Sequence, residues 1–306
     1  MRIDFHAHYY PPALIDGLAE LGGPRMHAGH PPDLGARLPV LDGAGIKRQI
    51  LSVGALMPYF PDRSNAHRAA QLFNQLHVEA MEPYSERFGA FATLPLPHLD
   101  ESVAEVDRCL DEFGFAGVAI GSGAGGLPID DDYFAPLWQK LEERQCVVYI
   151  HPGVNNGSVL GGVDYPPWLL NPSFGSPGET GRCVARLVLA GILDRYPGIT
   201  VIAANSGGLL PYEWPHLIRA AENTGHPELA GGLRKIWFDC GTSTEHSLMA
   251  VKASFGLDRL VLGTDMPYGD ALATVGLIQT SPHLGTHDAT RILDTAPEQA
   301  LHLTKG

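Results

Sequence analysis

The sequence has few positive charges, no paired cysteines and no long apolar run, and each of these shortages argues against a class of protein. Its 306 residues include 21 Lys and Arg against 34 Asp and Glu, which gives a formal net charge of -13. Without a basic stripe the chain would repel nucleic acid and anionic lipid, so we expect neither as a partner. No apolar segment reaches the roughly 20 residues that cross a membrane, and the start lacks the apolar core of a secretion signal.

The four cysteines are Cys109, Cys146, Cys183 and Cys240, and no two of them form a C-x-x-C pair. This spacing argues against a zinc ribbon or a disulfide framework and fits reduced thiols. We therefore predict a cytoplasmic protein. Charged residues make up 18% of the chain, and 36 Gly with 25 Pro indicate many turns around a buried scaffold.

The order of the expected elements predicts an α/β fold, the (β/α)8 TIM barrel. Helix-period patterns fill most intervals between eight short β-rich runs, for example at Ala66–Met81 and Glu101–Phe113. A strand followed by a helix, eight times over, is typical of such a barrel. No linker or internal repeat divides the chain, so we predict one domain over residues 1–306. The eight expected strands are Arg2–Phe5, Arg48–Val53, Phe88–Thr93, Phe115–Ile120, Cys146–Ile150, Thr200–Ala204, Ile236–Asp239 and Arg259–Leu262.

Two expected loops are unusually long. They cover residues 23–35 and 152–181, and the second contains Pro166-Pro167-Trp168 and Asn171-Pro172. A loop near 30 residues without secondary structure is usually functional in a compact domain. The second loop follows the fifth expected strand, on the barrel face where TIM-barrel enzymes place their sites. We expect both loops to border an active site.

Three histidines and an aspartate come at the carboxyl ends of expected strands. His6 and His8 follow the first strand, His151 the fifth and Asp265 the eighth. Side chains alternate across a strand with period two, so His6 and His8 point to the same face. Neutral imidazoles and a carboxylate suit Zn²⁺, and equally Mn²⁺, Fe²⁺ or Co²⁺. The four residues therefore predict a divalent-metal site at the mouth of the barrel.

Two competing motifs are weaker. Residues 121–126 read G-x-G-x-x-G, but Leu127-Pro128 and an acidic triplet follow them, where a dinucleotide site needs a helix N-terminus. Ser122 and Ser206 lie in Gly-rich turns without the G-x-S-x-G context of a nucleophilic serine. We expect neither dinucleotide binding nor serine catalysis.

Ordered motifs span nearly the whole chain. They are Ile3-Asp-Phe-His-Ala-His8, Gln49-Ile-Leu-Ser-Val53, Glu86-Arg-Phe88, Thr93-Leu-Pro-Leu96, Arg108-Cys-Leu-Asp-Glu-Phe-Gly-Phe-Ala-Gly-Val118, Val148-Tyr-Ile-His-Pro152, Gly178-Glu-Thr180, Tyr196-Pro197, Gly207-Gly-Leu-Leu-Pro211, Phe238-Asp239, Glu245-His246 and Leu262-Gly-Thr-Asp-Met-Pro267. In this order they resemble the amidohydrolase superfamily, and within it the branch of aminocarboxymuconate-semialdehyde decarboxylase.

The resemblance implies a distorted TIM barrel that holds one divalent metal ion, zinc or manganese, through His6, His8, His151 and Asp265. It implies non-oxidative decarboxylation of a small aromatic or unsaturated carboxylic acid as the activity. Zn²⁺ is the expected ion and Mn²⁺ the alternative. A homodimer or a higher homo-oligomer is also implied.

The sequence departs from this branch at two positions. Asn205 stands where the family has an acid/base histidine, and an amide cannot carry a proton at neutral pH. His216 stands where the family has an arginine that grips the substrate carboxylate. As replacements we expect Asp265 to act as both ligand and base, and His246 to approach the mouth. Trp168 matches a substrate-wall tryptophan of the family.

Three functions therefore stay open. The leading one is a metal-dependent lyase that releases CO₂. The second is a metal-dependent hydrolase of a lactone, amide or ester, in which Asp265 activates water without a histidine at position 205. The third is a metal-binding homologue with impaired catalysis, because Asn205 replaces the proton carrier.

Overall fold

Eight parallel strands form the barrel that the sequence predicts. The computed structural model describes the chain except residues 24–32, 154–170, 227–228, 242 and 302–306. The strands lie side by side in chain order, and each pairs in parallel with the next. They are β1 (Ile3–His8), β2 (Arg48–Ser52), β3 (Phe88–Thr93), β4 (Gly117–Ile120), β7 (Val147–Ile150), β8 (Thr200–Ala203), β9 (Trp237–Asp239) and β10 (Leu260–Val261).

Backbone hydrogen bonds join the first strand to the segment that follows the last one. Phe5 donates to the Leu262 carbonyl at 2.9 Å, and the Asp265 N–H donates to the His6 carbonyl at 2.7 Å. The His8 N–H donates to the Met266 carbonyl at 2.7 Å. The register of β1 against β2 shifts between Asp4 and Ala7, which makes the barrel locally irregular. These contacts bring Asp265 next to the two histidines of β1.

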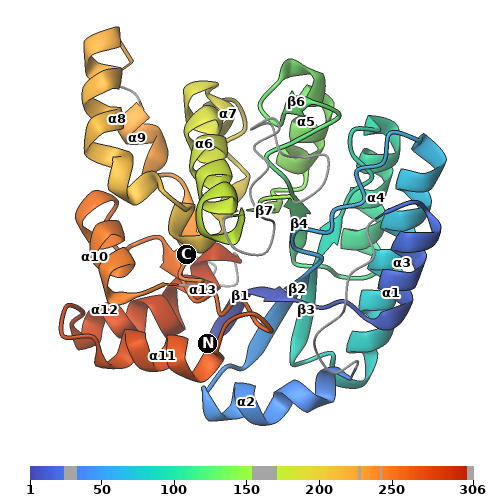
Figure 1. Cartoon of the computed structure of the whole chain (residues 1–306), viewed down its shortest axis with the longest axis horizontal. Coiled ribbons are helices and arrows are strands. Elements are labelled where there is room, and N and C mark those ends of the chain that lie inside the picture. The colour runs from blue at the N-terminus through green and yellow to red at the C-terminus, as the bar shows by residue number, and fades with distance from the viewer. Residues whose placement is uncertain (24–32, 154–170, 227–228, 242, 302–306) are drawn as a thin grey trace.

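The helices form a ring around the strands (Figure 1). They are α1 (Pro12–Glu20), α2 (Leu38–Gly43), α3 (Arg63–Met81), α4 (Leu99–Asp111), α5 (Ala135–Glu143), α6 (Ser176–Leu189), α7 (Ile192–Arg195), α8 (Leu210–Thr224), α9 (Leu229–Leu233), α10 (Glu245–Ser254), α11 (Ala271–Thr280), α12 (Thr286–Thr290) and α13 (Ala296–Ala300). Shorter helical turns are η1 (Leu34–Arg37), η2 (Glu82–Tyr84), η3 (Asp132–Phe134), η4 (Asn171–Gly175), η5 (Asn205–Gly207) and η6 (Arg291–Thr295). None of the described helices has the length and apolar character needed to cross a bilayer.

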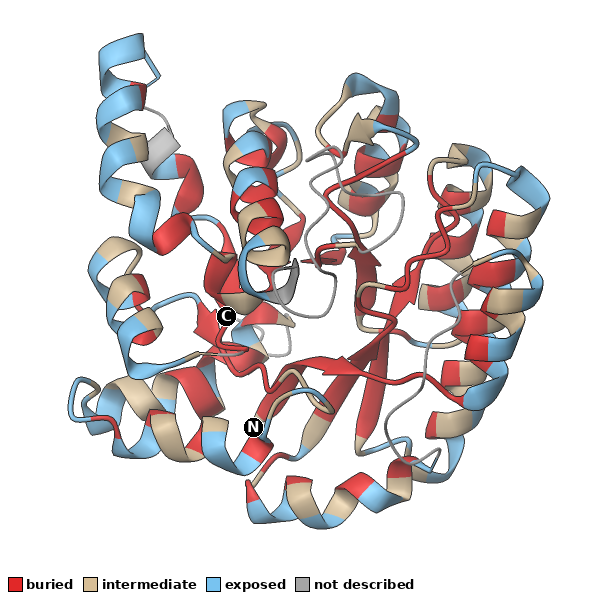
Figure 2. Cartoon of the chain, viewed as in Figure 1, coloured by how far each residue is buried: buried red, intermediate tan, exposed pale blue. Residues whose placement is uncertain are grey.

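Two layers of apolar side chains hold the fold together, and the strands are buried on both faces (Figure 2). Inside the barrel, Phe91 and Tyr149 stack with ring centroids 5.2 Å apart and pack with Phe5 and Ile202. A larger cluster fills the space between the strands and the helices. Because bulky residues fill the barrel interior, functional groups have room only at its ends.

The two long expected loops contain more secondary structure than the sequence predicts. Within residues 152–181, η4 forms at Asn171 and α6 begins at Ser176, so the end of the predicted loop is helical. Pro177 suits the first turn of α6 because a first-turn residue needs no N–H donor. Within residues 23–35, Leu34 and Gly35 belong to η1, which the Asp33 side chain caps. The remainder, residues 24–32 and 154–170 with Trp168, lies outside the described residues.

The segment at residues 121–126 does not begin a helix. The strands β5 (Gly123–Ala124) and β6 (Leu127–Pro128) pair there as a small antiparallel hairpin. The G-x-G-x-x-G pattern therefore builds a tight turn, as we expected.

Candidate metal centre and active site

Four side chains converge where the strands end. His6 and His8 come from β1, His151 follows β7, and Asp265 follows β10. Nε2 of His6 lies 3.1 Å from Nε2 of His8, and Oδ1 of Asp265 lies 3.1 Å and 3.0 Å from these two atoms. One ligand atom from each of the three histidines lies within 4.8 Å of the others. The predicted cluster is thus assembled in space.

The other ring nitrogen of each histidine has a partner. Nδ1 of His6 lies 3.2 Å from Asp239, and Nδ1 of His151 lies 2.9 Å from the Pro152 carbonyl. Nδ1 of His8 lies 3.3 Å from the Ser52 hydroxyl. The Asp239 carboxylate and the Pro152 carbonyl can only accept, so they place the ring proton of His6 and of His151 at Nδ1; the Ser52 hydroxyl can accept in the same way from His8. The Nε2 lone pairs are then available for a metal ion. This is the tautomer that a metal ligand needs.

The electrostatics of the cluster keep Asp265 charged. Burial opposes this charge, but His6 and His8 outweigh burial and hold the pKa of Asp265 well below its ordinary value. Burial also disfavours a charged His6, yet Asp239 and Asp265 raise its pKa. Burial, followed by the neighbouring His8 and His6, lowers the pKa of His151. The carboxylates of buried Asp239 and partly exposed Asp265 give the cluster negative charge that a bound cation would neutralise.

The sequence analysis missed Asp239 as a site residue. Its buried carboxylate contacts His6, accepts a 2.7 Å hydrogen bond from the Tyr149 hydroxyl, and accepts N–H bonds from Asn205 at 3.1 Å and Gly241 at 2.7 Å. Such a carboxylate fixes the orientation of a ligand imidazole. The sequence could have indicated Asp239 as a site residue, because it is the last residue of the seventh expected strand.

A buried arginine beneath the site was also missed. Arg37 donates to the His8 carbonyl at 2.5 Å and to Oε1 of Gln49 at 3.0 Å. Gln49 in turn donates to Asp4 at 2.7 Å, and Asp4 accepts from the Thr264 hydroxyl at 2.6 Å. This chain of bonds connects the backbone of His8 with the residue before Asp265. No local sequence pattern marks it, because its members come from four distant segments.

The other predicted site residues that the structure describes, Asn205, His246 and His216, lie on three separate helical elements. Asn205 begins η5 with a φ of +54°, and its backbone N–H binds Asp239. His246 is exposed in the first turn of α10. His216 is exposed on α8, with Nδ1 3.8 Å from Glu213. Trp168 lies outside the described residues. The structure thus brings Asn205 next to the buried carboxylate, and it shows His246 and His216 on helices.

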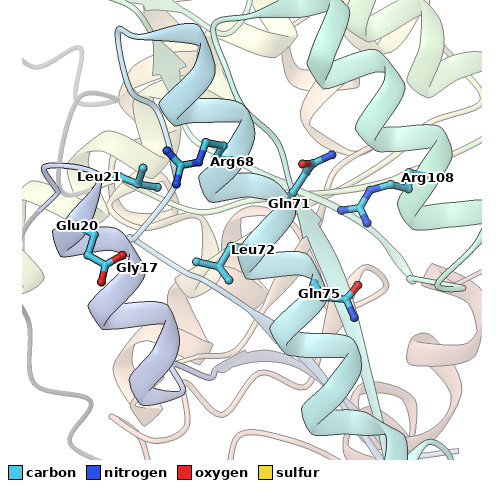
Figure 3. Close-up of a pocket in the computed structure, with 8 residues that line it drawn as sticks. All are labelled: Gly17, Glu20, Leu21, Arg68, Gln71, Leu72, Gln75 and Arg108. Atoms are coloured by element: carbon cyan, nitrogen blue, oxygen red, sulfur yellow. The ribbon is translucent and has the colours of Figure 1, made fainter.

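Two of the hollows in the described part of the chain lie between helices. His216 borders an apolar groove of about 440 Å³ between α6 and α8, together with Leu209, Leu217 and Arg182. A second groove of about 510 Å³ lies among α1, α3 and α4, where Arg68 and Arg108 line it (Figure 3). Neither groove shares a lining residue with the histidine cluster.

Comparison with known proteins identifies the family. The amidohydrolase family model matches residues 3–300. The chain belongs to the amidohydrolase family. Gamma-resorcylate decarboxylase of Rhizobium radiobacter is 29% identical to this amidohydrolase over 248 residues, 76% of each chain. The 2-amino-3-carboxymuconate-6-semialdehyde decarboxylase of Dictyostelium discoideum is 27% identical over 77% of this chain and 67% of its own. The family predicted from the motifs is confirmed.

A solved structure has the same barrel. The dihydroxybenzoic acid decarboxylase of Polaromonas sp. JS666 superposes with a TM-score of 0.84 and 21% identity, over 100% of this chain and 98% of its own. That crystal structure contains manganese and the inhibitor 2-nitroresorcinol. The TIM-barrel prediction for this amidohydrolase is confirmed, and its named relatives are decarboxylases.

Proposed function

We propose that this amidohydrolase is a divalent-metal-dependent decarboxylase, which releases CO₂ from a small aromatic or unsaturated carboxylic acid. The observation that carries the proposal is the convergence of three buried imidazoles, each with Nδ1 engaged, on the Asp265 carboxylate. The two curated relatives support the reaction type, because both are named as decarboxylases.

His6, His8, His151 and Asp265 would hold the ion. Zinc lies about 2.0–2.1 Å from nitrogen and oxygen ligands, which places neighbouring ligand atoms of a tetrahedral site about 3.3 Å apart. The separations of 3.0 Å and 3.1 Å among the His6, His8 and Asp265 atoms fit this donor set, and the His151 ligand atom lies within 4.8 Å of the other two imidazoles. We propose Zn²⁺ as the resident ion, because imidazoles predominate, with Mn²⁺ as the alternative that the Polaromonas enzyme contains.

When bound, the cation supplies positive charge that polarises the substrate oxygens. Asp265 supplies the carboxylate that accepts a proton from a substrate hydroxyl and then delivers it to the carbon that carries the substrate carboxylate. As the bond to the carboxylate breaks, its electron pair stays on that carbon and forms the new C–H bond with this proton. CO₂ leaves without any oxidant.

Asn205 then has a different role from an acid/base group. Its amide cannot carry the proton, but it can hydrogen-bond a substrate oxygen while its backbone holds Asp239. We also retain His246 as a second proton carrier, and Trp168 and His216 as substrate-contact residues. Substitution of each by a residue of similar size tests these assignments one at a time.

The experiment is an assay of CO₂ release by the protein after chelation and reloading with Zn²⁺ or Mn²⁺. The panel contains gamma-resorcylate, other ortho-hydroxybenzoates and muconate-like acids, together with esters and lactones. We expect CO₂ from at least one acid, and only after a metal is restored. Hydrolysis without CO₂ would establish the hydrolase, and turnover only in Asn205→His would establish an impaired homologue.

A further inference from the structure

The groove between α6 and α8 has the properties of a ligand site. The two helices lie side by side in the ring (Figure 1), and the hollow between them measures about 440 Å³. Ligand sites in proteins usually measure roughly 300–1,000 Å³ and are lined by apolar side chains with a few polar groups. This α6–α8 groove shares no lining residue with His6, His8 or His151. An occupant would therefore leave the proposed metal ligands in place.

The walls of the α6–α8 groove are apolar and partly open to water. Leu210 is buried, whereas Leu217 is half-buried and Leu209 is 39% exposed. Covering apolar surface that water contacts is favourable, so these walls favour an apolar occupant. On α6 the lining runs from Gly178 to Ala185, seven positions or about 10 Å along the helix. The groove is thus long enough for an extended hydrocarbon chain.

One edge of the groove carries a positive charge without a counter-charge. Arg182 lines the groove from α6, and no acidic side chain of the described residues pairs with it. Arg186, on the same helix, instead donates two hydrogen bonds of 2.8 Å and 2.9 Å to Asp130. On the opposite wall, the Glu213 carboxylate lies 3.8 Å from Nδ1 of His216 on its own helix. Because a guanidinium suits a carboxylate in shape and charge, Arg182 is available to an organic acid.

We propose that the α6–α8 groove binds a free aliphatic carboxylic acid of medium chain length. Its hydrocarbon chain covers Leu209 and Leu217, and its carboxylate pairs with Arg182. An inorganic anion would leave the apolar walls exposed, and an uncharged hydrocarbon would leave the guanidinium unpaired. An aliphatic acid satisfies both parts of the groove. The assignment concerns a second site and does not depend on the proposed decarboxylation.

The test of the charged contact is a calorimetric titration of the zinc-loaded protein with octanoate and with octanol. Octanol has the same chain without the charge, so it reports on the apolar walls alone. Arg182→Gln should weaken octanoate binding about threefold to tenfold, as expected for loss of an ion pair at an open edge, and leave octanol binding unchanged. Arg219→Gln removes the same charge from an exposed position of α8 outside the groove lining and should change neither affinity. Glu213→Gln removes a negative charge from the opposite wall and should strengthen octanoate binding only.

The apolar walls have their own test. Ala185→Leu places a larger side chain in the groove, so it should abolish the binding of octanoate and of octanol. Ala273→Leu makes the same change at an exposed position of α11 and should leave both affinities intact. Hexanoate is shorter by two CH₂ groups and should bind the unmodified protein about tenfold more weakly than octanoate. Circular dichroism of each variant shows that the chain is folded.

Four results would overturn the assignment. The first is no octanoate binding by the unmodified protein, and the second is an unchanged octanoate affinity in Arg182→Gln. The third is octanoate binding that persists in Ala185→Leu, which would place the acid elsewhere, for example at the zinc ion. The fourth is a dimer in sedimentation velocity that octanoate does not affect and that Ala185→Leu dissociates, which would mean that a second copy of the chain covers the groove. Because octanoate binding needs no turnover, failure of the CO₂ assay leaves this test intact.

Discussion

Nδ1 of His6 lies 3.2 Å from Oδ2 of Asp239, and both side chains are fully buried. A carboxylate behind an imidazole fixes which nitrogen carries the proton, and here it leaves Nε2 as the free lone pair. Asp239 is therefore a positioning residue whose effect reaches the proposed metal through His6.

The first prediction concerns Asp239→Asn. The amide keeps the shape but loses the charge that orients His6, so zinc affinity should fall about 10- to 100-fold in a competition titration with a chelating dye. Tyr149→Phe removes another contact to the same carboxylate at 2.7 Å and leaves the contact to His6 intact, so it should cost less. Equal losses in the two variants would contradict the orienting role.

The second prediction concerns Gly241→Ala. An added Cβ would lie 2.6 Å from Nδ1 of His6 and 2.9 Å from Oδ1 of Asp239, so the imidazole must move. Zinc affinity should fall while the chain still folds. Gly276→Ala in α11 meets no atom within 4 Å and should keep full affinity. Normal zinc binding in Gly241→Ala would show that His6 tolerates the shift.

The third prediction concerns Asp265→Asn. The amide can neither accept nor deliver the proton, so the rate of CO₂ release should fall about 10²- to 10⁴-fold, with zinc content measured in parallel. Asp16→Asn changes the net charge equally at an exposed position and should leave the rate unchanged. A near-normal rate in zinc-loaded Asp265→Asn would refute the proton-carrying role.

The fourth prediction concerns Arg37. Arg37→Met leaves the His8 carbonyl and Gln49 without their donor inside the protein, so the free energy of unfolding in urea should fall by about 2–4 kcal/mol. Arg37→Lys keeps the charge and should recover part of this loss. Arg219→Met on the exposed face of α8 should change stability by less than about 0.5 kcal/mol. A loss no larger than that of Arg219→Met would contradict the structural role of Arg37.

The fifth prediction concerns pH. Burial lowers the pKa of His77 from 6.5 to about 4, while its Nε2 lies 3.0 Å from the Tyr9 carbonyl. Between these two values the unfolded chain binds a proton that the folded chain does not. Stability contributed by neutral His77 is therefore complete above pH 6.5 and is lost as pH falls toward 4, by about 1.4 kcal/mol per pH unit.

His77→Gln tests this dependence, because its amide can still donate to Tyr9 but does not titrate. The difference in unfolding free energy between the variant and the unmodified chain should change with that slope from pH 6.5 to 4 in urea titrations. His287→Gln at an exposed position should show a constant difference. A constant difference for His77→Gln as well would contradict the shift.

The sequence predicted the four proposed ligands because strand ends in a parallel barrel share one face. His6, His8, His151 and Asp265 each follow a recognisable β-rich run, so their convergence needed no knowledge of side-chain packing. All eight strands lie where they were predicted, within a few residues at their ends, and β1 extends to His8.

The supporting residues could not be predicted in the same way. Arg37 looks like an ordinary charged residue before a short helix, and only the tertiary fold places it under His8. The start of α6 was missed because Ser176-Pro177-Gly178 has the composition of a loop, although proline suits a first helical turn.

The backbone hydrogen bonds between β1 and the segment after β10 also determine when the site can form during synthesis. His6 and His8 leave the ribosome well before Asp265 and Met266, which pair with β1. A nascent chain that has not yet reached Asp265 has an open barrel edge along β1 and an incomplete set of ligands. Assembly of the site therefore waits for Asp265, and a cation that binds all four residues would join β1 to the segment after β10.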